Sequence, residues 1–258
     1  MLLALDAGNT NVTVGIFQDG VLADHRRLRT VREQTSDEWG ILLMSLLRYA
    51  SLDPQNVHGI IISSVVPPIN SALAEMSQRY FGIEALFVTC DTDTGLIIRY
   101  DNPAEVGADR IVNSVAALHK YGGPCVVVDL GTAITFDAIS AKAEYLGGII
   151  AAGIGISVEA LFSRTARLPL VDFKKPASII GTNTVASMQS GLYYGAVGSI
   201  DGMIERLRGE LGPDTRVVAT GGQASLIAGE SRYIRHVDEN LTLDGLYLIW
   251  QRLRKRPQ

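Results

Sequence analysis

The chain has 258 residues, of which 47% are hydrophobic and 19% charged, and its formal net charge is −4. This composition is typical of a soluble globular protein that is long enough to bury a core without disulfide or metal staples. The negative charge argues against a general nucleic-acid surface, and we expect no nucleic-acid partner. A basic cluster near the C-terminus is better explained as a solvated helix end and consists of Arg252, Arg254, Lys255 and Arg256.

Export signals and membrane spans are not indicated by the sequence. The N-terminus starts directly with an apolar run at residues 2–6, and the weakly polar stretch 145–162 contains several glycines and Glu159. We therefore expect a cytoplasmic protein without a membrane partner. Cys90 and Cys125 are far apart and form no Cys-x-x-Cys motif, so we expect two buried thiols in a reducing compartment.

The first half of the chain predicts a sheet with helices. Residues 2–6 form a short apolar strand, and residues 12–16 alternate with the period of two that is typical of a strand. Asp19-Gly20 is a hairpin signal leading into a strand at 21–29. The elements expected next are a helix with a capping box at Thr35 and Glu38 that ends at Asp53-Pro54, a strand at 59–63, a helix opened by Pro67-Pro68, and a strand at 85–88.

The second half of the chain begins with the same order of predicted elements as the first half. Residues 125–129 are an apolar run that ends in aspartate, and a turn at Gly131-Thr132-Ala133 leads into a strand at 134–138. The other expected elements are a strand at 145–150, a buried strand at 216–219 before the turn Thr220-Gly221-Gly222, and helices near 157–165, 184–208 and 241–254.

A short internal sequence repeat relates the two halves. Residues 2–10 and 126–133 each read as an apolar strand, an Asp-x-Gly turn with a threonine, and the start of a return strand. The alternative is a chance likeness of two short strings. We predict a duplicated α/β domain, with residues 1–121 and 122–258 as the two copies and a ligand cleft between them.

The two Asp-x-Gly turns have the chemistry of phosphate loops. Gly8 lets the backbone approach a ligand closely and adopt a positive φ if needed, so that the amides of Asn9, Thr10 and Asn11 can face an anion. Asp6 would repel phosphate directly, but it can hold Mg²⁺ through water.

A second loop and a glycine turn add to this chemistry. This second loop again has an acid (Asp129), a glycine that allows close approach (Gly131) and a hydroxyl donor (Thr132). In the glycine turn, Gly221 and Gly222 leave room for a flat nucleoside. Each piece alone is common in ordinary turns, whereas the three in this order, each after a strand, form a specific set. The sequence has no Gly-x-x-x-x-Gly-Lys-Ser/Thr motif, which excludes a P-loop enzyme.

The segment from Tyr100 to Arg110 carries the candidate catalytic groups. Asp109 and Arg110 follow a glycine at the expected N-terminus of a helix. Asp109 could accept the proton of an attacking hydroxyl, and Arg110 could bind the transferred phosphoryl group or a substrate oxygen. Alternatively, Asp109 only caps the helix and Arg110 pairs with an exposed acid. Tyr100 and Asn102 could donate to substrate, or they could be a packed tyrosine and a turn asparagine.

Taken together, these motifs resemble the type III pantothenate kinases over residues 6–222. The segment 102–110 is the most family-specific part, and the Asp-x-Gly loops mark the wider actin/hexokinase-like superfamily. A departure from the family pattern is Ala152-Gly153, where the family usually has Pro-Gly. The matching pieces are Asp6-Ala7-Gly8-Asn9-Thr10-Asn11, Tyr100-x-Asn102-Pro103-x-Glu105-x-Gly107-Ala108-Asp109-Arg110, Asp129-Leu130-Gly131-Thr132-Ala133, Gly147-Gly148, Gly181-Thr182-x-Thr184, Ser190-Gly191 and Thr220-Gly221-Gly222.

The resemblance implies two ribonuclease-H-like (actin-like) domains with the nucleotide between them, a homodimer, and phosphorylation of pantothenate, the first step toward coenzyme A. It implies ATP with Mg²⁺ and a monovalent cation, K⁺ or NH₄⁺, held by Asp129. It also implies Asp109 as proton acceptor, and Thr184 as a residue that one subunit lends to the other. The ATP contacts implied are Asp6, Ala7, Gly8, Asn9, Thr10, Asn11, Val12, Thr13 and Thr132, and the pantothenate contacts are Tyr100, Gly107, Ala108, Asp109, Arg110 and Thr184.

Two other functions stay open from the residues alone. One is a different kinase or a phosphatase of the same superfamily, such as a sugar or acetate kinase, although the segment 100–110 argues against it. The other is a nucleotide-binding accessory protein without catalysis, although such a protein would have no use for a positioned base at Asp109.

Overall fold

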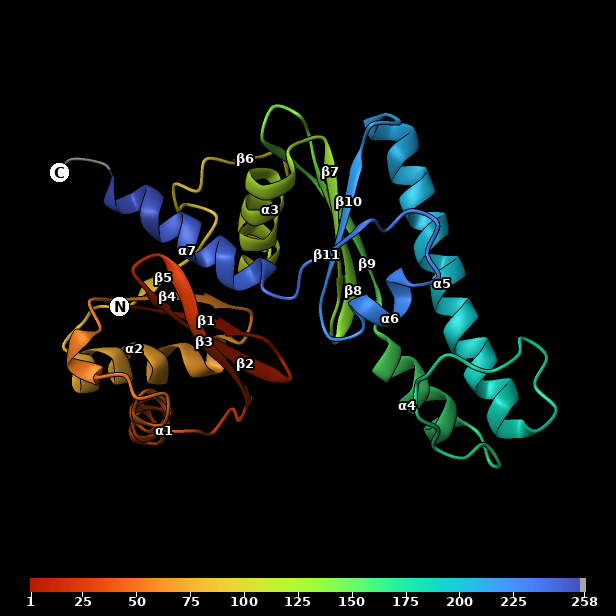
Figure 1. Ribbon diagram of the computed structural model, residues 1–258, viewed down its shortest axis with the longest axis horizontal. Helices are drawn as coiled ribbons and strands as arrows, with labels where there is room; N and C mark the ends of the chain where they lie inside the picture. The colour runs from red at the N-terminus through yellow and green to blue at the C-terminus, as the bar shows by residue number, and fades with distance from the viewer. Residues whose placement is uncertain (256–258) are drawn as a thin grey trace. The chain divides into compact units, whose positions relative to one another are not determined.

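The computed structural model describes residues 1–255, and the chain divides into two compact units (Figure 1). The first unit contains Met1–Leu96, Asp101–Ala116 and the C-terminal segment from Thr242 onward, and the second contains Ile97–Tyr100 and Ala117–Leu241. The C-terminal helix thus belongs by compactness to the first unit. From the sequence we predict that the two duplicated domains meet at residue 121, and this boundary stays a prediction.

The first unit is built on a five-stranded mixed sheet in the order β3-β2-β1-β4-β5. Strands β1, β2 and β3 pair antiparallel as a meander, whereas β4 and β5 run parallel to β1. The strands are β1 (Leu2–Ala7), β2 (Asn11–Gln18), β3 (Val21–Arg29), β4 (Gly59–Ser64) and β5 (Leu86–Phe87).

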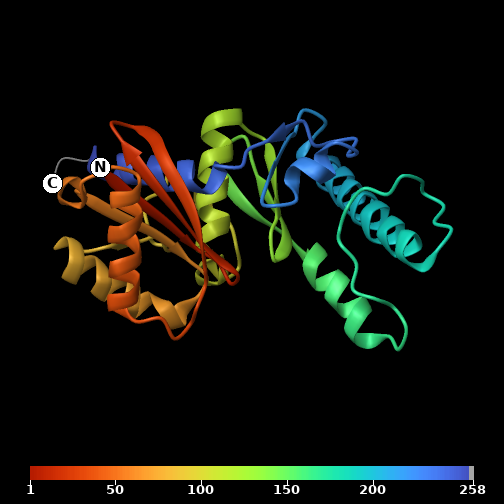
Figure 2. The ribbon, with the colours of Figure 1, turned by 60° about the horizontal axis from the view of Figure 1, so that its bottom comes forward.

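Helices cover both faces of this sheet. Helices α1 (Ser36–Tyr49) and α2 (Pro67–Phe81) share a buried core with one face (Figure 2), whereas residues of α7 (Leu241–Arg254) lie against Gly15 of β2 and Gly59 of β4. Burial on both faces explains why β1 and β4 read as continuous apolar runs rather than alternating ones.

Local sequence signals account for the starts and turns of these elements. The predicted capping box is confirmed: the Glu38 amide donates to the Thr35 hydroxyl at 3.3 Å, and the Thr35 amide donates to the Glu38 carboxylate at 2.8 Å. Asp19 and Gly20 both have positive φ, 50° and 89°, as a two-residue hairpin requires. The first helix ends at Tyr49, before the predicted stop, and Asp53 instead caps the 3₁₀ turn Pro54–Asn56.

The second unit is built on a six-stranded sheet in the order β11-β10-β7-β8-β9-β6. Helix α5 packs on one face and contributes Tyr193, Val197, Ile200 and Ile204 to the buried core. The strands are β6 (Ile97–Ile98), β7 (Cys125–Leu130), β8 (Ala133–Ile139), β9 (Glu144–Ala152), β10 (Arg216–Thr220) and β11 (His236–Val237), and the helices that lie wholly within this unit are α4 (Ile154–Arg164), α5 (Thr184–Leu211) and α6 (Ala224–Ala228).

The two sheets confirm the duplicated fold. The order β3-β2-β1-β4-β5 recurs as β9-β8-β7-β10-β11, with the same parallel and antiparallel pairs, and β6 is an addition at the β9 edge. The burial pattern is identical along β1 and β7, so Asp6 and Asp129 occupy equivalent positions near the end of the first strand of each unit.

Three further findings concern predictions from composition. Cys125 is buried, but the prediction that both thiols are buried is wrong for Cys90, which is half-buried; both cysteines are free. Within residues 1–255, no helix combines the length and apolar character needed to cross a membrane. Arg252 and Arg254 lie in the last turn of α7 as predicted, and Arg256 lies outside the described residues.

Candidate active site

The first Asp-x-Gly loop joins β1 to β2 and leaves Asn9 and Thr10 exposed. The Gly8 amide donates to the Asn11 carbonyl at 3.0 Å, and Thr30 at the end of β3 holds the loop through its hydroxyl, which donates to the Gly8 carbonyl at 2.6 Å. Gly8 does not have a positive φ; an added Cβ would make a tight contact of 3.2 Å with the Asn11 carbonyl oxygen, which glycine avoids.

The second loop, between β7 and β8, has the same construction with one residue fewer. The Gly131 amide donates to the Ala133 carbonyl at 3.1 Å, and Thr132 is exposed. Gly153, at the start of α4, packs so closely on this loop that a Cβ would lie 1.9 Å from the Thr132 carbonyl oxygen. Only glycine fits there, whereas the neighbouring Ala152, which departs from the family pattern, is exposed.

The third predicted element, the turn after β10, lies against Asp129. Gly221 has a φ of 92°, and a Cβ there would lie 2.6 Å from the Asp129 carboxylate and 2.7 Å from the Leu130 carbonyl oxygen. Asp129 therefore lies between the β7–β8 turn and the β10–α6 turn, which joins the second and third predicted elements into one site within the second unit.

A buried hydroxyl lies beside each of the two aspartates. In the sheet register Asp6 pairs with Ser63 of β4, and Asp129 pairs with Thr220 of β10. Ser63 has no exposed surface, and its hydroxyl has no hydrogen-bond partner among residues 1–255. Ser63 was missed by our reasoning from the sequence; the available signal was a polar residue directly after the run Ile60-Ile61-Ile62 of a buried strand.

The segment that leads into α3 (Ala108–Tyr121) is held by hydrogen bonds among its own polar groups. The Asn102 side-chain amide donates to the Glu105 carboxylate at 2.8 Å across the 3₁₀ turn Pro103–Glu105, so both residues shape the turn. Asp109 lies in the first turn of α3, as predicted, and its carboxylate accepts the Arg110 amide at 2.7 Å. Arg110 is 7% exposed, so it is a buried residue rather than a surface one.

The environment of Asp109 raises the pKa of its carboxyl group. Burial is the dominant cause, while the Arg110 amide and the positive charge of Arg110 act in the opposite direction. Gly107 permits this burial, because a Cβ at Gly107 would lie 2.5 Å from the Asp109 carboxylate. A carboxyl group with a raised pKa, near the N-terminus of a helix, has the character of a general base.

The end of β4 connects Asp109 to the first phosphate loop. The Val65 amide donates to the Ala7 carbonyl at 3.0 Å, and the Val65 side chain is 3.4 Å from where a Cβ of Gly107 would stand. The structure thus brings the segment of Gly107 and Asp109 next to the end of β1 within the first unit.

Tyr100 and Thr184 lie in the second unit. Tyr100 follows β6 and tilts against Tyr145 with 6.3 Å between ring centroids, beside Gly147, whose φ is 119°. Thr184 is the first residue of α5 after the Asn183 cap and lines a groove of about 740 Å³. No interaction among the described residues joins Thr184 to the other predicted site residues.

Comparison with known proteins decides the family. Residues 2–206 match the type III pantothenate kinase family. The chain belongs to that family. A type III pantothenate kinase from Solibacter usitatus (strain Ellin6076) is 65% identical over 98% of this chain and 97% of the relative, and those of Koribacter versatilis (strain Ellin345) and Myxococcus xanthus (strain DK1622) are 56% and 53% identical, each over 98% of this chain and over 96% and 98% of their own lengths.

Solved structures of distant relatives share the fold of this type III pantothenate kinase family member. MreB 5 of Spiroplasma citri, bound to AMPPNP, superposes with a TM-score of 0.58 at 10% identity and covers 98% of this chain and 97% of its own. The (R)-2-hydroxyglutaryl-CoA dehydratase component A of Acidaminococcus fermentans gives 0.57 at 13% identity, over 98% and 99%. These matches establish the actin-like fold and nothing about the substrate.

The site residues can bind a phosphate-bound divalent cation, although no cage of three or more acidic, histidine or cysteine side chains exists among residues 1–255. Mg²⁺ usually takes one or two carboxylates and completes its shell with phosphate oxygens and water. Asp6, near the end of β1 and before the exposed amides of the first loop, fits that role.

Proposed function

We propose that this protein transfers the terminal phosphoryl group of ATP to the primary hydroxyl of pantothenate, the first step of coenzyme A synthesis, with a divalent cation. The observation that carries the proposal is the half-buried carboxyl group of Asp109, with its raised pKa, next to the end of the strand that carries Asp6. Family membership supports pantothenate as the acceptor.

The first unit supplies the base and one phosphate loop. Ala7 to Thr13 contact ATP through backbone amides and hydroxyls, while Asp6 would hold Mg²⁺ through water. Asp109 accepts the hydroxyl proton of pantothenate as the new P–O bond forms, and ADP leaves with the electrons of the broken bond. The cation supplies charge neutralisation between the phosphates when it is bound.

The second unit supplies further donors. Thr132 is exposed at the tip of its loop and contacts ATP. Substrate specificity comes from Tyr100 and Thr184 of this unit, together with the backbone and side chains of residues 107–110 of the first unit. The buried position of Arg110 suits a fixed guanidinium that binds a substrate oxygen rather than a mobile surface group.

Asp129 is proposed to hold the monovalent cation, K⁺ or NH₄⁺. Support comes from the position of its carboxylate close to Gly131 and Gly221. Backbone carbonyl oxygens, such as that of Leu130, lie near the same place. We predict that kcat falls several-fold when Na⁺ replaces K⁺ at equal ionic strength, because a smaller ion fits a preformed oxygen site poorly. Equal rates in the two salts would remove this role from Asp129.

We propose a cytoplasmic homodimer, with the α4–α5 region as its interface. Large apolar side chains are exposed along α4, the following loop and the start of α5, and a patch of this kind on a soluble protein marks a contact surface. The residues concerned are Ile156, Leu161, Phe162, Leu170, Ile179, Ile180 and Val185.

The deciding experiment is an assay of purified protein with ATP, Mg²⁺ and pantothenate, with phosphopantothenate detected by mass spectrometry. Glucose and acetate serve as alternative acceptors. The proposal requires phosphopantothenate in amounts that match the ADP formed. Turnover of sugar or acetate without pantothenate would establish the other kinase function, and ATP binding without any transfer would establish the accessory protein.

A further inference from the structure

A pocket of about 320 Å³ lies in the first unit, at the end of the sheet opposite to the phosphate loop. Leu2 lies in its wall, and Asp6 is four residues further along the same strand. At about 3.3 Å per residue, the pocket and the carboxylate are roughly 13 Å apart along β1. The pocket is therefore separate from the groups assigned to phosphoryl transfer.

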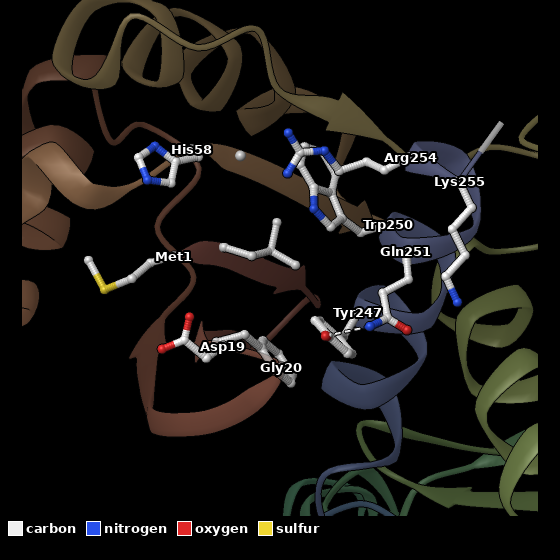
Figure 3. A pocket seen from close by; sticks show the side chains of 12 residues that line it. Met1, Asp19, Gly20, His58, Tyr247, Trp250, Gln251, Arg254 and Lys255 are labelled. Atoms are coloured by element: carbon white, nitrogen blue, oxygen red, sulfur yellow. Dashed lines mark hydrogen bonds between the residues drawn. The ribbon is translucent and has the colours of Figure 1, made fainter. Parts of the chain in front are cut away.

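Three of the residues that line this pocket carry large aromatic rings, and these rings pack closely on their neighbours (Figure 3). Tyr247 of α7 stacks on Phe17 with 4.7 Å between ring centroids and an angle of 10°. Trp250, one helical turn later, packs against Gly59 so closely that a Cβ there would lie 2.1 Å from the indole. The hydroxyl of Tyr247 accepts a hydrogen bond from the Gln251 side chain at 2.5 Å. Fixed rings of this kind are what a flat apolar ligand needs.

The rim of the pocket is basic, although the protein as a whole is acidic. Arg254 at the end of α7 and Lys255 directly after it line the pocket, with His58 on the opposite wall and Asp19 as the one acid in the wall among the described residues (Figure 3). The Arg254 guanidinium lies 5.2 Å from the Trp250 ring centroid, so a cation is held directly at the aromatic wall. In contrast, Arg252 of the same basic cluster is paired with Asp93 at 3.0 Å and does not line the pocket.

We propose that this pocket is a second binding site, for a small organic anion with a flat apolar body. The body lies among Phe17, Tyr247 and Trp250, and its charged group meets Arg254 and Lys255. The volume is at the lower end of the range for small-molecule sites, which favours a ligand of one or two rings over a whole coenzyme. A carboxylate and a phosphate ester share this chemistry, and the experiment separates them.

The test uses 2-naphthoate and 2-naphthyl phosphate as probes, with uncharged 2-naphthol as the matched control, added to the full-length ¹⁵N-labelled enzyme. The chain has two tryptophans, Trp250 at the pocket and Trp39, which is fully buried in the α1 core. We expect an anionic probe to shift the indole N–H signal of Trp250 and to leave that of Trp39 unchanged. Trp250→Phe assigns the two signals.

The charge requirement is tested with Arg254→Gln/Lys255→Gln. We expect binding about tenfold weaker in this double variant, since two favourable contacts to the anion are lost. The matched control is Arg48→Gln, at the end of α1 and away from the pocket, which should bind like the wild type. An unchanged rate of pantothenate phosphorylation shows that each variant is folded.

The relative affinities of the two anions tell whether carboxylate or phosphate fits the rim better. Three results would overturn the proposal: no shift of the Trp250 signal by either anion, equal binding of uncharged 2-naphthol, or equal binding by the double variant. None of these results bears on phosphoryl transfer at Asp109, so the two proposals fail separately.

Discussion

Asp109 combines two properties that oppose one another, burial and charge. A buried carboxylate costs free energy, which the Arg110 amide only partly offsets, and such a cost is common where a residue has a chemical role. We predict that Asp109→Asn lowers kcat by roughly 10²–10⁴-fold, as expected for loss of a general base, while ATP binding persists. Steady-state kinetics and nucleotide titration measure both. Asp101→Asn, an exposed acid in the same segment, is the control and should leave kcat unchanged.

The raised pKa of Asp109 also determines whether the stability of the protein rises or falls with pH. The folded state binds the Asp109 proton more tightly than the unfolded state, so this residue lowers stability as pH rises from the ordinary aspartate pKa through the raised one. We therefore predict that Asp109→Asn is as stable as the wild type at acid pH and more stable above the raised pKa. Urea denaturation at several pH values measures the difference. A variant less stable than the wild type at neutral pH would contradict this account.

The two cysteines differ in reactivity for the same physical reason. Burial raises the pKa of the Cys125 thiol to about 12, with the charge of Arg216 opposing the shift, whereas Cys90 is half-buried. Because the thiolate is the reactive form, we predict that a disulfide reagent at neutral pH modifies one thiol in the native protein and two in denaturant. Cys90→Ser should abolish the native reaction. Two rapidly reacting thiols in the folded wild type would contradict the burial of Cys125.

The elements predicted from the sequence are those whose signal is local. Strands β1, β3, β7 and β10 and helix α7 are marked by apolar runs, turn residues and caps within a few positions, and their observed bounds agree closely with the prediction. The two-residue strands β6 and β11 and the short helix α6 were missed. Each exists because a neighbouring strand or turn provides its partner. Strand β6 (Ile97–Ile98), for example, pairs with β9, and β11 pairs with β10. A sequence window does not contain that partner.

The same distinction applies to the candidate site. Asp109 was found because a glycine and a helix start flank it in the sequence. The packing of the neighbouring Gly107 against Val65 involves a residue more than forty positions away, and the hydroxyl of Ser63 beside Asp6 depends on strand pairing. The residue types of the site were therefore predictable, while the environment that sets their pKa and their neighbours was not.

The turns include positions where a single added methyl group has a large effect. Gly221 has a positive φ, and its Cβ position is filled by Asp129 and Leu130, so we predict that Gly221→Ala destabilises the protein by about 1–3 kcal/mol. Chemical denaturation measures the change. Gly209→Ala is the control, since Gly209 is exposed on α5 with open space around it, and alanine there should stabilise by about 0.5–1 kcal/mol.

At the scale of the whole molecule, duplication explains why the proposed site residues occur in both units. Each unit carries one aspartate near the end of its first strand and one glycine loop, so neither unit alone holds the complete set. The groove beside Thr184 shares no residue with either loop, and large apolar side chains are exposed around it. The exposed apolar side chains around this groove support our proposal that a second subunit contacts it.

Mixing two inactive variants tests that contribution directly. If Thr184 acts on the active site of the partner subunit, a dimer of one Asp109→Asn chain and one Thr184→Val chain holds one site with both defects and one intact site. Since half of randomly mixed symmetric dimers are of this kind, the mixture should recover about a quarter of wild-type activity at a low pantothenate concentration. Each variant alone is the control. No recovery after verified subunit exchange would show that Thr184 acts within its own subunit or has no role in the site.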